Sequence, residues 1–222
     1  MKELKVTELF DLSHTAASEL LSSVEYPWEA LPKIKDFILE LGSRLSPEEY
    51  DSPAEGVWIS KKATVAGNAT VNAPCIICAD AEIRQCAFIR GSALVGEGAV
   101  VGNSCELKNC ILFDKVQVPH FNYVGDSVLG YKSHMGAGAI TSNVKSDKTL
   151  VAVAIDGEKI ATGLKKFGAI LGDCVEVGCN SVLNPGTVIG KNTNVYPLSS
   201  VRGYIPPRSI LKSPDCVVTK KD

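Results

Sequence analysis

Arg90, Lys108 and His120 are the residues of this sequence that first suggest chemistry. The two cations are separated by three hexapeptides, and each directly follows a bulky apolar residue, Ile89 or Leu107. If they lie side by side, their repulsion favours a shared anion, and phosphate suits a guanidinium and an ammonium group. A histidine side chain, with an ordinary pKa of about 6.5, suits a general base at neutral pH. The three residues therefore point to a phosphorylated ligand and a proton transfer.

The same residues also have structural interpretations. Surface cations form a solvated ridge wherever water and salt screen them. His120 lies within residues 118–126, where the spacing of apolar residues is irregular, and a lone histidine is more often structural than catalytic. His134, directly before Met135, is expected to face outward near a corner. The fold that positions these side chains decides between the interpretations.

A six-residue repeat provides that fold. Steps of six give an unbroken series of bulky apolar residues: Ile59, Val65, Val71, Ile77, Ile83, Ile89, Val95, Val101, Leu107 and Phe113. A second, mostly small series follows four positions behind each member: Ala63, Ala69, Cys75, Ala81, Ala87, Ala93, Ala99, Cys105, Ile111 and Gln117. Tyr123, Leu129 and Met135 keep the step through an irregular stretch, and the full pattern returns at Leu171.

This period predicts a hexapeptide β-helix, since neither a helix nor a plain strand produces it. Three hexapeptides complete one triangular coil, and coils stack as parallel strands about 4.8 Å apart. We therefore expect a mainly β protein with roughly six coils, from the number of hexapeptides divided by three. Residues separated by three hexapeptides share a corner on successive coils, which places Arg90 and Lys108 on one edge.

Glycines and cysteines take ordinary places in this scheme. Seven glycines directly follow a large inward residue, where we expect the turn to need a permissive backbone: Gly96, Gly102, Gly130, Gly136, Gly172, Gly178 and Gly190. Cys75 and Cys105 fill the small inward position in place of alanine. Cys75 and Cys78 form a CxxC pair, but no second pair follows, so a structural zinc site lacks half its ligands. We expect no metal site.

Two segments depart from the repeat. Residues 1–50 carry apolar residues at spacings of three and four, which predicts two helices, and Ser46 begins a short third helix. We expect this leader to pack on or beside the first coils and to close the end of the core. Residues 141–170 should leave the β-helix as a long loop or hairpin that turns at Asp156. The expected domains are a helical leader 1–50, a β-helix 51–212 and a C-terminal tail 213–222.

The composition excludes several classes of protein. The chain has 222 residues, with 23 Lys and Arg against 25 Asp and Glu, so it has no basic excess for binding nucleic acid. No apolar run reaches the roughly 18 residues of a membrane span, and we expect no membrane partner. The first eleven residues include acidic ones where a signal peptide has an apolar core, so we expect a cytoplasmic protein with free thiols.

The stretch from Arg90 to Asn143 resembles the acetyltransferase half of the bifunctional bacterial enzyme that makes UDP-N-acetylglucosamine. That half is a left-handed parallel β-helix, assembled as a homotrimer with active sites between subunits. Its phosphate-clamping arginine and lysine resemble Arg90 in FIRGS and Lys108 in CELKN, and its catalytic histidine and sugar-binding tyrosine resemble His120 and Tyr123 in PHFNYVGD. The resemblance implies a left-handed β-helix and a homotrimer for this chain.

The last part of the resemblance lies in residues 136–143, which are similar to the GAGT-I-T-x-N segment of that family, with Asn143 on a substrate-contacting asparagine. Three positions differ. His134 replaces a sugar-contacting asparagine, while Cys179 and Pro197 stand near acyl-CoA positions that are usually serine and alanine. Residues 1–50 are too short and too helical to be the family's nucleotidyltransferase half, so we expect no uridylyl transfer.

The resemblance implies an acyl-CoA-dependent acyltransferase, with acetyl-CoA as donor and a phosphorylated amino sugar or a nucleotide sugar as acceptor. In this hypothesis His120 is the base. The implied acceptor-binding residues are Arg90, Lys108, Tyr123, His134 and Asn143, and the implied cofactor-binding residues are Cys179 and Pro197.

Two alternatives remain from the sequence. One is a non-catalytic module that binds a sugar phosphate or acts as a scaffold, which the three departures favour. The other is a zinc-dependent carbonic anhydrase of the same fold, which needs three histidines, two of them five residues apart. Here His120 and His134 are separated by more than two hexapeptides, with no further histidine in the repeat.

Overall fold

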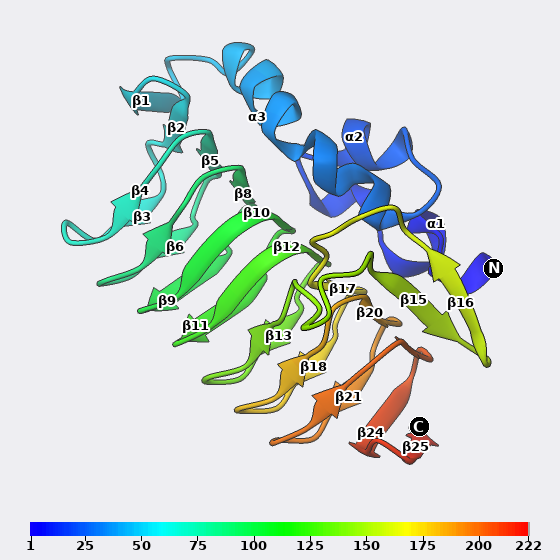
Figure 1. Ribbon diagram of the computed structural model, residues 1–222. Helices are drawn as coiled ribbons and strands as arrows, with labels where there is room; N and C mark the ends of the chain where they lie inside the picture. The colour runs from blue at the N-terminus through cyan, green and yellow to red at the C-terminus, as the bar shows by residue number, and fades with distance from the viewer. Residues whose placement is uncertain (222) are drawn as a thin grey trace.

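The protein is a left-handed parallel β-helix with a helical leader lying along one of its sides (Figure 1). This structure is a computed structural model, and it describes residues 1–221. Successive strands turn around a triangular coil and pair in parallel with the strands of the coils before and after them. The fold predicted from the six-residue repeat is therefore confirmed.

We call the side beneath the leader the covered face. It contains the second halves of β10 (Glu106–Leu112) and β12 (Tyr123–Leu129), and its other strands are β2 (Val57–Ser60), β5 (Cys75–Ile77), β8 (Ala93–Val95), β17 (Ala169–Leu171), β20 (Thr187–Ile189) and β23 (Tyr204–Ile205).

The next side along each coil is the open face. Its strands are β3 (Thr64–Val65), β6 (Glu82–Ile83), β9 (Val100–Asn103), β11 (Gln117–His120), β13 (His134–Met135), β18 (Glu176–Val177), β21 (Asn194–Val195) and β24 (Ser209–Ser213). Each of these two faces thus has eight strands in the described part of the chain, which is more than the roughly six coils expected.

The third face completes the triangle. It contains the first halves of β10 and β12, and its other strands are β4 (Thr70–Val71), β7 (Phe88–Ile89), β14 (Ile140–Thr141), β19 (Val182–Leu183) and β22 (Ser200–Val201). Two further strands extend the faces in the antiparallel direction. β1 (Tyr50–Ala54) pairs with β2, and β25 (Cys216–Thr219) pairs with β24.

The repeat slips by one residue within β10. Leu107 pairs with Ile89 on the preceding coil, three full hexapeptides away, but it pairs with Val124 on the following coil, one residue short of that separation. The corner at Asn109, where φ is 50°, contains one residue fewer than the equivalent corner of the preceding coil. The prediction that Tyr123 and Phe113 point inward is therefore wrong.

Val124 and Leu112 take the inward positions instead, and both are fully buried. Tyr123 lies on the outer surface of the third face, where it is half-buried. Phe113 is buried against the leader, with its ring centroid 4.8 Å from that of Phe10.

The seven glycines after large inward residues are required by close packing and not by turn geometry. None of them has a positive φ, whereas many corners are formed by non-glycine residues such as Ser104 and Lys115 in the left-handed region. A Cβ on Gly102 would fall on the carbonyl of Pro119 in the next coil, and one on Gly96 would lie 2.5 Å from the backbone of Phe113. The predicted reason for these glycines is wrong, because the neighbouring coil approaches too closely for a side chain.

The leader runs along the covered face and does not close the end of the core. Its helices are η1 (Lys2–Leu4), α1 (Val6–Leu9), η2 (Leu12–His14), α2 (Ser18–Ser22), η3 (Pro27–Lys33) and α3 (Ile34–Ser43). α3 packs on β5, β8 and β10, and η3 packs on β12 (Figure 1). Val65 and Val71 of the first coil remain only partly buried. The predicted end cap is therefore wrong, and the predicted third helix at Ser46 is a single turn.

The outer surface of the covered face is apolar because the leader buries it. Residues at its outward positions pair from coil to coil and are at most 1% exposed: Ile76, Leu94, Ile111, Val128, Ile170 and Val188. Side chains on successive residues of a strand point to opposite faces, so these strands are buried both inside and outside the coil. The leader and the β-helix therefore share one continuous core.

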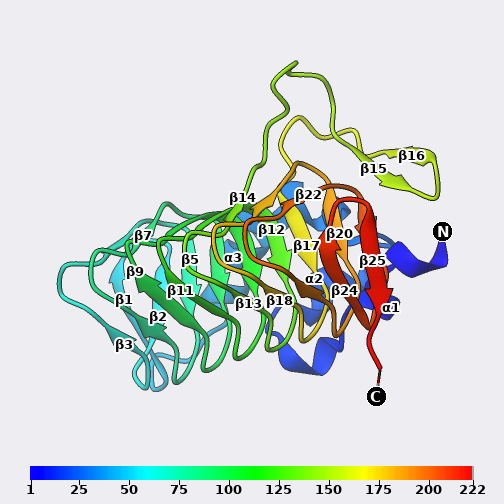
Figure 2. The ribbon, with the colours of Figure 1, turned by 90° about the horizontal axis from the view of Figure 1, so that it is seen from below.

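The insertion predicted at residues 141–170 is present as a hairpin. β15 (Ala152–Ile155) pairs with β16 (Glu158–Ala161) through a tight turn in which Asp156 and Gly157 both have positive φ. Figure 2 shows that the insertion extends beyond the coils. Val153 and Ile155 are buried, and Gly203 leaves room for the carbonyl of Ala154.

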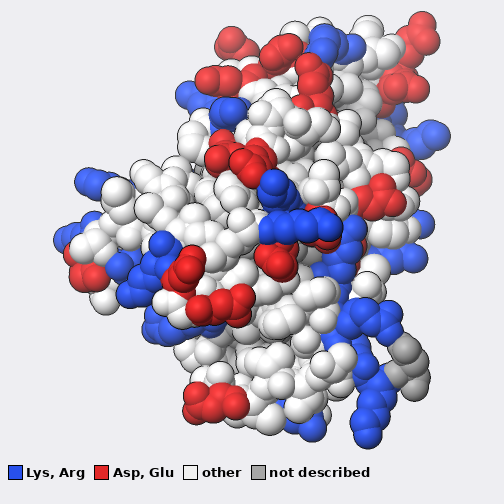
Figure 3. Space-filling model, turned by 90° about the vertical axis from the view of Figure 1, so that its right-hand side faces the viewer, with Lys and Arg blue, Asp and Glu red and all other residues white. Residues whose placement is uncertain are grey.

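One face of the molecule carries charged side chains of both signs (Figure 3). Figure 3 shows acidic and basic side chains beside each other over much of the face that carries the leader and the insertion, in keeping with a net charge of −2. Among the described residues, no helix has the length and apolar character needed to cross a membrane.

Candidate functional site

A polar cluster lies where the third face meets the leader and the insertion. Its centre is the carboxylate of Asp126, which is 3% exposed. Lys108 places its Nζ 2.9 and 3.1 Å from the two carboxylate oxygens. Asn109 donates to Oδ1 at 2.9 Å, and Asn143 donates to Oδ2 at 2.5 Å. A nearly buried carboxylate thus receives three side-chain donors, which compensates for its lost hydration.

Arg90 and Lys108 stack on adjacent coils, as their spacing predicted, because Ile89 pairs with Leu107. Each cation already has a carboxylate partner. Arg90 Nη1 lies 2.7 Å from Glu106 Oε1, and Lys108 is held by Asp126. The side chains of Arg90 and Glu106 are 47% and 34% exposed, whereas that of Asp126 is 5% exposed. The carboxylate partner of Arg90 is therefore the more accessible to a competing anion, whereas that of Lys108 is nearly buried.

Tyr123 lies along β12, with its ring above Gly125. A Cβ on Gly125 would come within 2.7 Å of the ring's Cζ atom, so only glycine leaves room for the ring there. Asn143 Nδ2 donates to the Tyr123 hydroxyl at 3.2 Å. Burial, together with the carboxylates of Asp126 and Glu106, raises the pKa of Tyr123. The phenol therefore keeps its proton and presents it as a hydrogen-bond donor.

His120 ends β11 at the corner between the open face and the third face, three residues before Tyr123. Its side chain is exposed, and no hydrogen bond to its ring occurs within residues 1–221. The buried side chain of Asn122 fixes this corner: its Oδ1 accepts from the His120 backbone at 3.1 Å, and its Nδ2 donates to the Gly136 carbonyl at 2.9 Å. The corner is rigid, while the imidazole is free to meet a ligand.

His134, Cys179 and Pro197 line a shallow hollow of about 260 Å³ on the open face, beside the corner that carries His120. His134 Nδ1 lies 2.8 Å from Glu176 Oε2 on the next coil. His134 is therefore apart from Lys108, Tyr123 and Asn143, with which it was assigned to the acceptor. The structure does bring His134 together with the two residues assigned to the cofactor.

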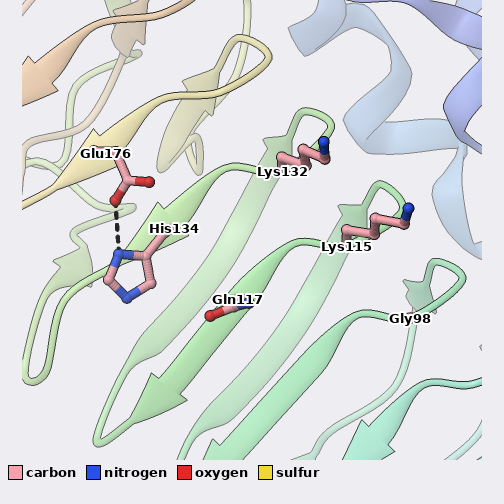
Figure 4. Close-up of a pocket in the computed structure, with 6 residues that line it drawn as sticks. All are labelled: Gly98, Lys115, Gln117, Lys132, His134 and Glu176. Carbon is pink, nitrogen blue, oxygen red and sulfur yellow. Dashed lines mark hydrogen bonds and ion pairs between the residues drawn. The ribbon is translucent and has the colours of Figure 1, made fainter.

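A larger hollow of about 620 Å³ adjoins it and shares His134 and Glu176 (Figure 4). Gln117 lies on its floor, and Lys115 and Lys132 lie at successive corners on its border. Figure 4 shows that both lysine side chains extend away from His134. Within residues 1–221 neither has a carboxylate within ion-pair distance, and Lys132 Nζ lies 5.1 Å from the ring of Tyr131.

Sequence reasoning missed Glu106, Asn109 and Asp126, which hold the cluster together. One signal was available, since Asp126 follows Lys108 by three hexapeptides just as Lys108 follows Arg90. Opposite charges at that spacing predict an ion pair between coils as clearly as like charges predict an anion site. The role of Asn109 had no such signal, because one of its partners belongs to the leader.

The cysteines and acidic groups form no metal site that the described residues reveal. Within residues 1–221, no three side chains of His, Cys, Asp or Glu are close enough together to hold an ion. Cys75, Cys78 and Cys110 are buried free thiols. Burial raises the pKa of the Cys78 thiol to about 12 and that of the Cys110 thiol to about 12, so neither is a nucleophile at neutral pH.

A family model described as the GMPPB C-terminal domain matches residues 71–188, which is more than half of the chain. The bifunctional protein GlmU of Methanococcus maripaludis is 31% identical over 203 residues, covering 90% of this chain and 49% of the relative. The bifunctional sugar-1-phosphate nucleotidylyltransferase/acetyltransferase of Sulfurisphaera tokodaii is 34% identical over 110 residues, covering 50% of this chain and 27% of the relative. This chain thus spans about half the length of the GlmU relative, and its match covers 27% of the Sulfurisphaera tokodaii relative.

Solved structures with some likeness include a mutant of AntD, an N-acyltransferase from Bacillus cereus, in complex with dTDP and coenzyme A. Its TM-score is 0.38 at 19% identity, over 75% of this chain and 82% of that one. The acetyltransferase domain of PglB from Neisseria gonorrhoeae, in complex with acetyl coenzyme A, gives a TM-score of 0.34 at 14% identity, over 74% of this chain and 57% of that one.

Proposed function

Because the chain belongs to the GMPPB C-terminal domain family, we propose that it is a sugar acyltransferase that uses acetyl-CoA as its donor. The acceptor is an amino sugar that carries a phosphate, either as a sugar phosphate or within a nucleotide sugar. Two relatives support this class by name: the bifunctional protein GlmU, which matches 90% of the chain, and a bifunctional sugar-1-phosphate nucleotidylyltransferase/acetyltransferase, which matches 50% of it.

One observation carries the proposal. The cluster brings together residues from four successive coils: Arg90, Lys108, Tyr123 and Asn143. Its tyrosine is three residues after His120. The cluster offers a guanidinium for phosphate, a protonated phenol and an amide for sugar hydroxyls, and a nearby imidazole for proton transfer.

The reaction needs no covalent intermediate on the protein. The acceptor nitrogen attacks the thioester carbonyl, so that an N–C bond forms and the C–S bond breaks. His120 accepts the proton that the nitrogen loses, and the proton then passes to the departing thiolate of CoA. Acetylated sugar and free CoA are the products.

The acceptor and acetyl-CoA bind to different groups of the assigned residues. Arg90, Tyr123 and Asn143 hold the acceptor on the third face, with Lys108 fixing the cluster through Asp126. Cys179 and Pro197 border the acetyl-CoA on the open face, with His134 beside them. His120 lies at the corner between the two faces, where the reacting atoms meet.

The exposed imidazole also supports the rest of the proposal, in which the protein works as a homotrimer with each site between two subunits. No ring partner orients His120 among the described residues of one chain, so a second subunit at this corner would supply what the site lacks. The exposed side chains of Phe121 and Leu198, at 62% and 79%, lie beside His120 and Pro197 and suit such a contact.

A non-catalytic sugar-phosphate-binding or scaffold module is the second candidate, and one observation favours it. Asp126 already forms an ion pair with Lys108, the group that a substrate phosphate would otherwise bind. Turnover decides between the two. Purified protein is incubated with acetyl-CoA and glucosamine 1-phosphate, or with nucleotide amino sugars, and CoA release is followed. Release that needs both substrates supports the enzyme, whereas sugar-phosphate binding without release supports the module.

A further inference from the structure

Two residues of η3 connect the leader to the surroundings of the polar cluster. The carbonyl of Leu31 accepts a hydrogen bond from Asn109 Nδ2 at 3.2 Å. The ring of Trp28 lies 5.9 Å from the ring of Phe167, which ends the insertion, and both rings are buried. One short segment of the leader therefore approaches the cluster from two directions.

Both contacts lead to the residues that form the acceptor site. Asn109 Nδ2 also donates to Asp126 Oδ1 at 2.9 Å, so the same amide joins the leader to the central carboxylate. The Phe167 backbone N–H donates to the Asn143 carbonyl at 3.0 Å, and the next N–H, that of Gly168, donates to the Asp126 carbonyl at 2.8 Å. Asp126 and Asn143 are thus each fixed through an element that rests on the leader.

We propose that residues 28–31 of the leader are a positioning element of the acceptor site, acting through Asn109 and Phe167 on Asp126 and Asn143. Asn109 is the positioning residue of this arrangement. Because Asp126 holds Lys108, and Asn143 holds the Tyr123 hydroxyl, the leader sets the geometry in which the acceptor is recognised. The part of the inference that concerns the acceptor rests on the proposed function.

Docking of the leader does not depend on Asn109. The leader makes separate contacts further along the covered face, where the Asp11 N–H donates to Asp173 at 2.7 Å and the ring of His14 stacks 3.6 Å from that of Tyr131. It also buries many apolar side chains, which contribute more than one hydrogen bond does. Removing the Asn109 amide therefore loosens the cluster while the leader stays in place.

Asn109→Gly is the appropriate variant. Asn109 has a φ of 50°, a conformation that glycine adopts freely, so the substitution removes the amide without straining the corner. Asn192→Gly is the matched control, since Asn192 has a φ of 59° at an exposed corner of another coil and contacts no residue of the cluster. A difference between the two variants therefore reports the amide and not the backbone.

The first measurement is hydrogen exchange of the free protein, which needs no substrate. Asn109→Gly is expected to speed exchange of the Phe167 and Gly168 amides, while Asn192→Gly leaves them as in the wild type. Trp28→Phe should have the same effect through the second contact, and Trp58→Phe, at the other tryptophan of the chain, should not. If the two glycine variants exchange alike at these amides, the coupling is absent and the inference is wrong.

The second measurement is steady-state kinetics with glucosamine 1-phosphate and acetyl-CoA. Asn109→Gly should raise the acceptor KM by about 5- to 30-fold, as expected for one or two lost polar contacts, and should leave the KM for acetyl-CoA unchanged. An equal rise in both KM values, or none in either, contradicts a role in the acceptor site. If the wild type turns over no acceptor, the proposed function fails, and the exchange comparison still decides whether the leader holds Asp126 and Asn143.

Discussion

On the covered face, the strands from β5 to β20 are buried on both sides, whereas the open face buries only its inward side. The two faces have similar inward residues, and the outward position on one coil is Ile111 on the covered face and Gln117 on the open face. The comparison teaches that the six-residue repeat determines the coil, while the outward residues determine what each face contacts. Apolar outward residues hold the leader, and polar ones leave the hollows beside His134 open.

The largest expected effect comes from placing a charge on the covered face. Ile111→Asp buries a carboxylate between the leader and the coil, and we expect it to lower the free energy of unfolding by about 4 kcal/mol or more. Val100→Asp, at an outward position of the open face, should cost less than about 1 kcal/mol. Urea denaturation of both variants measures the difference. Similar losses of unfolding free energy in the two variants would contradict the difference in outward burial between the two faces.

The next largest effect is expected on the rate of acetyl transfer, when the imidazole at the corner of the open face is removed. His120→Ala is expected to slow acetyl transfer by about 10²- to 10⁴-fold, the usual contribution of a general base. Because the side chain is exposed, the melting temperature should stay unchanged. His134→Ala serves as the comparison, with a smaller effect expressed in the KM for acetyl-CoA.

A smaller effect is expected from Lys108→Ala, since it removes the ammonium group from a nearly buried carboxylate. The free energy of unfolding should fall by about 1–3 kcal/mol. Arg90→Ala, on the exposed pair, should instead raise the acceptor KM and leave unfolding unchanged. The double variant Lys108→Ala with Asp126→Asn should recover part of the lost stability. No recovery would mean that Asp126 is not the group that Lys108 stabilises.

The smallest effect is expected at the border of the larger hollow. Lys115→Ala and Lys132→Ala should each change the free energy of unfolding by less than about 0.5 kcal/mol, because neither ammonium group has a carboxylate partner among the described residues. Thermal melts and acetyl-CoA kinetics of the two variants measure this. A rise in the acetyl-CoA KM would extend the functional surface of the open face to this edge.

The sequence predicted the coil well, because inward positions are determined by local spacing. It failed at Tyr123 and Phe113, where one residue missing from the corner at Asn109 shifts the phase. The irregular spacing over residues 118–126 marked a disturbance but did not locate the corner that causes it. Sequence reasoning also placed the leader at the end of the core. The apolar outward residues, such as Leu94 and Val128, were the sign of a covered face, but the six-residue count did not include them.

The candidate site was predictable in part for the same reason. Arg90 and Lys108 share an edge because coil spacing is regular, and the stacking follows directly. The ion pairs that each of them makes, and the link from Asn109 to Leu31, depend on side-chain directions and on a leader far away in the sequence. Spacing within the repeat carries no information on either.

Acetyl transfer itself tests the central claim most directly. Wild-type protein and His120→Ala are each incubated with acetyl-CoA and glucosamine 1-phosphate, and then with nucleotide amino sugars, while free CoA and acetylated sugar are quantified by mass spectrometry. We predict equal amounts of CoA and acetylated sugar from one acceptor with the wild type, and a loss of about 10²-fold or more with His120→Ala. No acetylated product from any acceptor, or equal rates for the two proteins, would contradict the account.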